Sequence, residues 1–146
     1  MKCNCIETEP PAVVAASNVR LPMGLLGFEQ MKDYLLIANP EEEPFGRLQV
    51  KGDASLCFVV INPFLIAPDY HPDIPQADVD FLGLKNPEDA LLLNIVTVQK
   101  QGQAATMNLK GPIVINRNTG IGKQVVIANA SEYSVQHPLL VSEAAG

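Results

Sequence analysis

The sequence predicts a mainly β fold, a small antiparallel β-barrel-like single domain with one short helix. Short apolar stretches rich in β-branched and aromatic residues recur along the 146 residues, and turn segments separate them. The 12 prolines and 10 glycines suit many tight turns, and the 47 % hydrophobic content is enough for a substantial core. Closure of the sheet would protect strand edges that so apolar a chain could not safely expose.

The first half of the chain is expected to form four strands, of which the fourth is the most apolar: 13–21, 33–38, 46–50 and 56–61. The turn after the first strand contains Gly24 and Gly27, which can adopt positive φ. The unbroken apolar run of the fourth strand predicts burial on both faces, with Cys57 as a small buried hydrophobe. Pro63 ends this strand because proline has no amide hydrogen to donate.

A stiff segment between Pro68 and Pro72 follows the fourth strand almost at once. It carries an acid, a phenol and an imidazole: Asp69, Tyr70 and His71. These three side chains cannot all be buried. If the protein has a working surface, we therefore expect part of it here.

One helix is expected over residues 75–82. Pro75 suits its first turn, Asp73 could cap it, and Gly83 suits its C-terminal end. Apolar residues at helical spacing share one face of this segment, so its carboxylates Asp78 and Asp80 are expected on the outside.

The second half of the chain is expected to form four more strands: 90–99, 105–110, 113–116 and 124–128. Alternation along the longest predicts one side with Leu91, Leu93 and Ile95, and another with Leu92, Val96 and Val98. Residues beyond 131 are expected to be mostly irregular. The predicted organisation is an N-terminal tail and start of the first strand over 1–18, the domain over 19–140, and a C-terminal tail over 141–146.

The net charge of −6 disfavours direct contact with nucleic acid, because such a chain repels phosphate backbones. A basic partner protein would be attracted instead, although the acidity also suits plain solubility. No apolar run approaches the roughly 20 residues of a membrane helix, and the start lacks a basic signal-peptide region. We therefore expect a cytoplasmic protein without membrane contact.

Motifs that carry chemistry are scarce. The chain has two histidines, His71 and His137, and no Gly-x-Ser-x-Gly elbow, phosphate-cradling glycine loop or Cys-x-x-Cys pair. Without clustered ligands we expect no metal site, no cofactor and no enzymatic activity.

Recognition of another protein suits the pattern around the stiff segment better. Apolar anchors are expected at Phe64, Leu65 and Tyr70, with His71 beside them. Carboxylates surround them: Asp69, Asp73, Asp78 and Asp80. An apolar centre with a charged rim is how protein-binding patches are built, although an ordinary solvated face gives the same pattern of charge. Both interpretations stay open from the residues alone.

Four stretches in order resemble the flagellar assembly factor FliW family, over about residues 19–140. They are Leu-Pro-Met-Gly-Leu-Leu-Gly-Phe-Glu at 21–29, Phe-Val-Val-Ile-Asn-Pro-Phe-Leu-Ile-Ala-Pro-Asp-Tyr at 58–70, Asn-Pro-Glu-Asp at 86–89 leading into 94–98, and 106–116 followed by 122–126 and 133–139. Three positions depart from the family pattern: Leu26, His71 and Gln136. His71 makes the local charge pH-dependent, which puts partner contacts there in doubt.

The resemblance implies a non-enzymatic cytoplasmic regulator with a compact β-barrel-like fold. Members of the family bind new flagellin near its C-terminal region, and the free protein binds CsrA, a small RNA-binding translational repressor. Binding stops CsrA from repressing flagellin mRNA. We expect Phe64, Leu65 and Tyr70 to anchor an amphipathic flagellin helix. The carboxylates Asp69, Asp73, Asp78 and Asp80 are expected to face CsrA.

Two other classes stay open. An RNA-binding small barrel would need a basic face with stacking aromatics, which the charge opposes. A small-molecule barrel, such as a flavin binder, would need a deep pocket with convergent polar groups.

Overall fold

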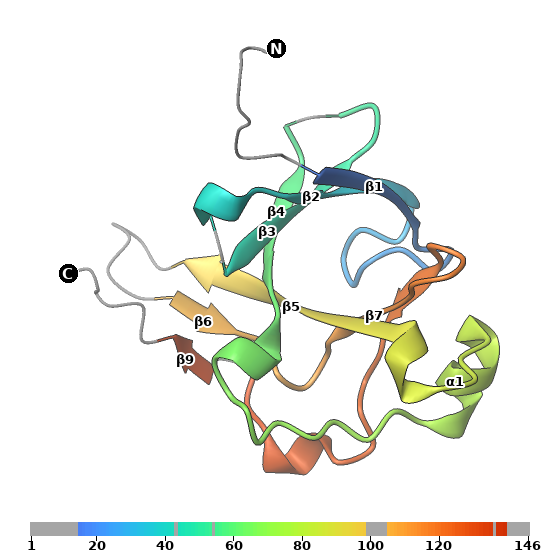
Figure 1. Ribbon diagram of the computed structural model, residues 1–146, viewed down its shortest axis with the longest axis vertical. Helices are drawn as coiled ribbons and strands as arrows, with labels where there is room; N and C mark the ends of the chain where they lie inside the picture. The colour runs from blue at the N-terminus through green and yellow to red at the C-terminus, as the bar shows by residue number, and fades with distance from the viewer. Residues whose placement is uncertain (1–14, 43, 54, 99–104, 136, 140–146) are drawn as a thin grey trace.

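The computed structural model describes residues 15–42, 44–53, 55–98, 105–135 and 137–139 (Figure 1). Nine strands of the described chain form one antiparallel sheet: β1 (Ala15–Arg20), β2 (Asp33–Ala38), β3 (Phe45–Val50), β4 (Cys57–Ile61), β5 (Ala90–Val98), β6 (Ala105–Met107), β7 (Ile113–Asn116), β8 (Gly122–Gln124) and β9 (His137–Leu139). The helix is α1 (Gln76–Leu82), and short 3₁₀ turns lie at η1 (Pro40–Glu42), η2 (Pro63–Leu65), η3 (Pro87–Asp89) and η5 (Ala130–Glu132). The predicted mainly β class with one short helix is confirmed.

The sheet runs β1-β2-β3-β4-β5-β6-β9, with β7 and β8 branching from β5. The branch exists because β5 is long: its first half pairs with β7, its last three residues pair with β6, and Val60 and Ile61 of β4 pair with its middle. The strands do not close into a barrel. The nearest approach to closure is an isolated bridge between Arg20 and Ile121, where the Arg20 N–H donates to the Gly120 carbonyl at 2.9 Å.

Side chains on the two faces of β5 belong to two different apolar cores. The first core contains Leu93 and includes Leu21, Tyr34, Leu48, Val60 and Ile113. The second contains Val96 and includes Ile61, Tyr70, Met107, Leu109 and Val125. The predicted alternation along the longest strand is thus confirmed: Leu91 and Ile95 pack against the first core and Leu92 against the second.

The helix ends as predicted, at Gly83 in the left-handed conformation (φ 68°). Its N-terminus differs from the prediction, because Pro75 occupies the N-cap position and no side chain caps the helix. Asp73 instead belongs to the preceding extended segment. Asp78 was expected outside, but it is buried at 8 % exposure because it pairs with Lys123 of β8.

Three other expectations are corrected. Cys57 is exposed, because β4 pairs with β5 only through Val60 and Ile61, which leaves the start of β4 uncovered. The strand expected over 124–128 lies at Gly122–Gln124, and residues 137–139 form β9 where irregular chain was expected. Residues 1–14, 141–146 and Gln136 lie outside the described residues.

The turn after β1 depends on two glycines with positive φ, as predicted: Gly24 at 67° and Gly27 at 88°. A Cβ at Gly24 would lie 2.5 Å from the Cα of Glu29 and 2.6 Å from the Phe28 carbonyl oxygen. A Cβ at Gly27 would meet nothing within 4 Å. Of these two glycines, therefore, only Gly24 lies where the chain packs closely against itself.

Gly24→Ala should destabilise the fold more than Gly27→Ala. Both variants place alanine in the left-handed region, which costs about 1–2 kcal/mol. Only Gly24→Ala adds a clash with backbone atoms, worth roughly 1–3 kcal/mol more. Urea denaturation measures both free energies of unfolding, and equal losses would contradict the close approach at Gly24.

Candidate protein-binding groove

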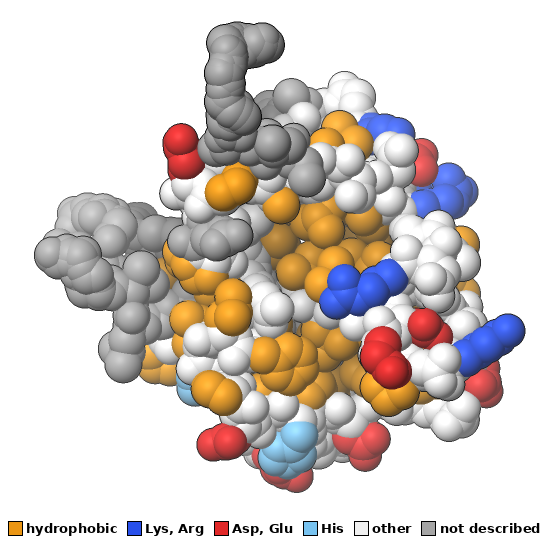
Figure 2. All heavy atoms as spheres, viewed as in Figure 1, with side chains coloured by type: hydrophobic (Ala, Val, Ile, Leu, Met, Phe, Trp, Pro, Cys, Tyr) orange, Lys and Arg blue, Asp and Glu red, His pale blue; other side chains and the backbone are white. Residues whose placement is uncertain are grey.

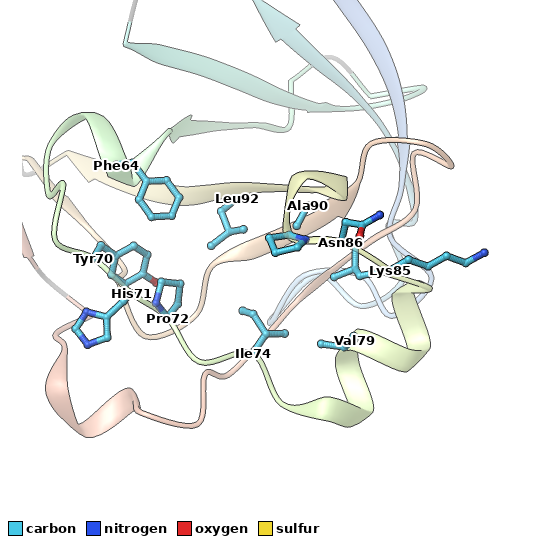
Figure 3. A pocket seen from close by; sticks show the side chains of 12 residues that line it. Phe64, Tyr70, His71, Pro72, Ile74, Val79, Lys85, Asn86, Ala90 and Leu92 are labelled. Carbon is cyan, nitrogen blue, oxygen red and sulfur yellow. The ribbon is translucent and has the colours of Figure 1, made fainter.

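An open apolar groove of about 500 Å³ runs between β5 and the segment that leads into α1 (Figure 3). Its lining comes from η2, residues 70–74, α1, residues 84–87 and the start of β5: Phe64, Tyr70, His71, Pro72, Ile74, Val79, Leu84, Lys85, Asn86, Pro87, Ala90 and Leu92. Figure 2 shows hydrophobic side chains across the centre of this face and acidic side chains along its lower edge. Grooves of this size and chemistry suit the apolar face of another polypeptide.

The first wall of the groove is β5 together with Phe64 of η2. The Asn62 side chain accepts a hydrogen bond from the Phe64 N–H at 2.9 Å, which caps η2. Phe64 is 41 % exposed, and its ring lies 5.8 Å from the ring of Tyr70. The Asn-Pro-Phe sequence therefore ends β4 and presents an aromatic side chain at the groove.

The second wall begins with residues 71–73, which we call the strap. Asn129 holds it at two points: its Oδ1 accepts from the Asp73 N–H at 2.8 Å, and its Nδ2 donates to the His71 carbonyl at 3.0 Å. The Tyr133 hydroxyl accepts from the His71 N–H at 3.0 Å, and the Ala128 N–H donates to the Asp73 carbonyl at 2.7 Å. The strap is thus fixed without belonging to the sheet.

The second wall continues into α1, which is tied to the branch formed by β7 and β8. Lys123 forms an ion pair with Asp78, and its ammonium lies 5.5 Å from the centroid of the Phe81 ring. Asn116 donates from Nδ2 to the Leu82 carbonyl at 2.8 Å. These contacts hold the helix in place beside the groove, and they leave Asp78 unsuited to contact a partner.

Tyr70 forms the boundary between the groove and the second core. It is only 4 % exposed, and its hydroxyl donates to the Leu109 carbonyl at 2.6 Å. Burial raises the pKa of Tyr70 to about 12, since it disfavours the phenolate; a hydrogen bond with Asn94 acts in the opposite direction. Tyr70 was expected to be an exposed anchor. It is buried instead, because its hydroxyl donates to the Leu109 carbonyl and its ring packs inward, with the ring centroids of Tyr70 and Tyr133 4.9 Å apart.

The structure brings together only part of the predicted site. Phe64, Tyr70 and His71 line the groove, whereas Leu65 is 63 % exposed and lies outside the lining. The predicted carboxylates other than Asp78 are exposed: Asp69, Asp73 and Asp80. The sequence did not predict the rest of the apolar lining or the role of Asn129. The alternation along β5 could have indicated that Leu92 faces this side of the strand. No local pattern marks Asn129.

Within the described ranges, no group of three or more His, Cys, Asp or Glu side chains is placed to hold a metal ion. No helix in the described part of the chain is long and apolar enough to cross a membrane.

The fold and the groove define a small mainly β protein with an open apolar groove between two anchored walls. A sequence model described as FliW protein matches residues 5–139. The chain is 39 % identical over 143 residues to the flagellar assembly factor FliW of Leptospira interrogans, covering 95 % of both chains. It is 39 % identical over 122 residues to the flagellar assembly factor FliW of Natranaerobius thermophilus, covering 83 % of this chain and 80 % of that one.

A solved crystal structure of the flagellar assembly factor FliW is similar as well. It has a TM-score of 0.75 and 35 % sequence identity, and the match covers 83 % of this chain and 84 % of that one. The chain belongs to the FliW family.

The stability of the fold should fall at high pH through Tyr70. Its folded pKa of about 12 exceeds the ordinary value of 10.0, so between these values the folded chain keeps a proton that the unfolded chain has released. The contribution of Tyr70 to the free energy of unfolding is fully present below pH 10 and is lost as the pH rises through 12. Urea denaturation from pH about 9 to about 11.5 should show the loss.

Tyr70→Phe is the control, because it removes the titrating hydroxyl and keeps the ring. Its free energy of unfolding should fall less steeply with pH. Some slope should remain, since burial also raises the pKa of Tyr34. Parallel pH profiles for the two proteins would show that Tyr70 is not protected in the folded state.

Proposed function

We propose that this protein is a flagellar assembly factor that acts in the cytoplasm as a non-enzymatic regulator, by binding flagellin and the translational repressor CsrA. The anchored apolar groove is the observation that carries this proposal. The relatives named flagellar assembly factor FliW support it, because they match nearly the whole chain. Free protein would bind CsrA and relieve repression of flagellin mRNA, and flagellin would occupy the protein until it is exported.

The groove is the proposed site for the C-terminal region of flagellin. An amphipathic helix buries a row of apolar side chains spaced three and four residues apart, and a groove between two fixed walls accepts such a row. Phe64 is the exposed aromatic anchor, and Leu92 and Ile74 line the floor and the opposite wall. Leu65 stays a candidate contact outside the groove.

For CsrA we propose contact through the exposed carboxylates of the same region. Asp69, Asp73 and Asp80 are exposed, and the protein has a net charge of −6. A basic repressor would be attracted by this charge, and binding to the repressor requires no contact with RNA. Asp78 is left out of this surface because Lys123 already pairs with it.

Phe64→Ala should weaken binding of full-length flagellin by about tenfold or more, because it removes an exposed aromatic anchor. Calorimetry with flagellin from the same bacterium measures the affinity. Phe28→Ala is the matched control: Phe28 is exposed to a similar extent, 37 % against 41 %, but lies outside the groove lining. Equal affinities of the two variants would remove the groove from the flagellin site.

Replacing Asp69, Asp73 and Asp80 together by asparagine should weaken CsrA binding and flatten its salt dependence. The wild-type affinity should fall as salt rises from about 50 to about 500 mM, because exposed charges are screened. The control replaces three exposed carboxylates outside this group: Glu41→Gln, Asp53→Asn and Glu88→Gln. An affinity for CsrA that does not change with salt would contradict the electrostatic part of the proposal.

A further inference from the structure

A second hollow, of about 520 Å³, lies on the other side of Tyr70 and His71 from the groove. These two residues line both spaces, so they form a shared wall. The second hollow differs from the groove because more charged and polar side chains contribute to its lining: Asp69, Glu132, Tyr133, Ser134 and His137. The apolar groove and the hollow are therefore neighbours, and Tyr70 and His71 form the ridge between them.

The hollow carries negative charge. Asp69 and Glu132 line it, and there is no lysine or arginine among the described residues of its lining. In the described part of the chain neither carboxylate pairs with a lysine or arginine; Glu132 lies 3.5 Å from Nε2 of His71, and both side chains are more than half exposed. The Nδ1 of His71 is engaged by the Tyr133 hydroxyl at 3.1 Å and by the Asp69 carbonyl at 2.8 Å. In the described part of the chain, therefore, no lysine or arginine compensates the charge of the two carboxylates.

The two ends of the groove differ in charge. The Asp69 and Glu132 carboxylates stand beyond its His71 end, and Lys85 lies at the other end (Figure 3). A cationic side chain of a bound segment would therefore be attracted to the two carboxylates at the His71 end, whereas at the other end the carboxylate of Asp89 offsets the charge of Lys85. A charge difference of this kind fixes the register and direction of a ligand that apolar contacts alone would let slide.

We propose that the groove and the hollow bind one amphipathic segment of flagellin, with its apolar side chains in the groove and a lysine or arginine side chain in the hollow. This inference rests on the proposed function. The cation lies between the carboxylates of Asp69 and Glu132. The aliphatic stem of such a side chain packs against the aromatic ridge, and its charged group favours the face of the Tyr133 ring. The hollow thus selects partners that carry a basic residue beside an apolar row.

The test is calorimetry of full-length flagellin with Glu132→Gln, which removes the charge and keeps the shape. We expect about fivefold to tenfold weaker binding and a shallower dependence on salt. Glu132→Lys should weaken binding further, because it places a cation in the hollow. Glu88→Gln is the matched control, since Glu88 is an exposed carboxylate near the Lys85 end, and its affinity should equal that of the wild type. Asp69→Asn is a second variant that tests whether the charge of the same hollow contributes to binding.

The outcomes separate this inference from the proposed function. If Phe64→Ala weakens binding but neither Glu132→Gln nor Asp69→Asn does, the groove binds flagellin and the cation site is wrong. If Glu132→Gln and Glu88→Gln weaken binding equally, only general attraction operates and the cation site is again overturned. If the wild-type protein does not bind flagellin, the proposed function fails and the inference falls with it.

Discussion

The structure depends on burial of both faces of β5. Leu93 and Val96 lie three residues apart on the same strand, yet each is buried in a different apolar core. A strand that is apolar on both sides must be covered on both sides, since an exposed apolar face of this size would bind indiscriminately. The strands β1–β4 supply one cover, and the chain between β4 and β5, with Tyr70 and with Leu82 of α1, supplies part of the other.

The second cover is held by polar side chains where no sheet hydrogen bonds are available. Asn62 caps the turn that carries Phe64, Asn129 holds the strap, and Asn116 holds the end of α1. Backbone groups of irregular segments need hydrogen-bond partners when they pack against a core, and asparagine can both donate and accept. These side chains connect segments that are as much as 58 residues apart, which fixes both walls of the groove.

A groove with walls fixed in this way loses little conformational entropy when a partner enters it. In the binding that we propose, the apolar lining would supply the driving force and the charged residues around it would supply selection. The shared wall of Tyr70 and His71 shows how these roles meet: one residue is buried with its hydroxyl satisfied, and the next is exposed beside Glu132. Of these two neighbours in the sequence, one thus lies in the core and the other at the surface.

The sequence by itself determined the mainly β class, the apolar character of both faces of the longest strand, and the helix with its C-terminal glycine. Those features follow from local periodicity and backbone chemistry, which are written in adjacent residues. Only the tertiary structure decided that Tyr70 and Asp78 are buried, that Cys57 is exposed, and that Asn129 holds the strap. Each of these outcomes depends on a partner distant in sequence, Leu109 for Tyr70 and Lys123 for Asp78, and no local pattern encodes which distant groups will meet.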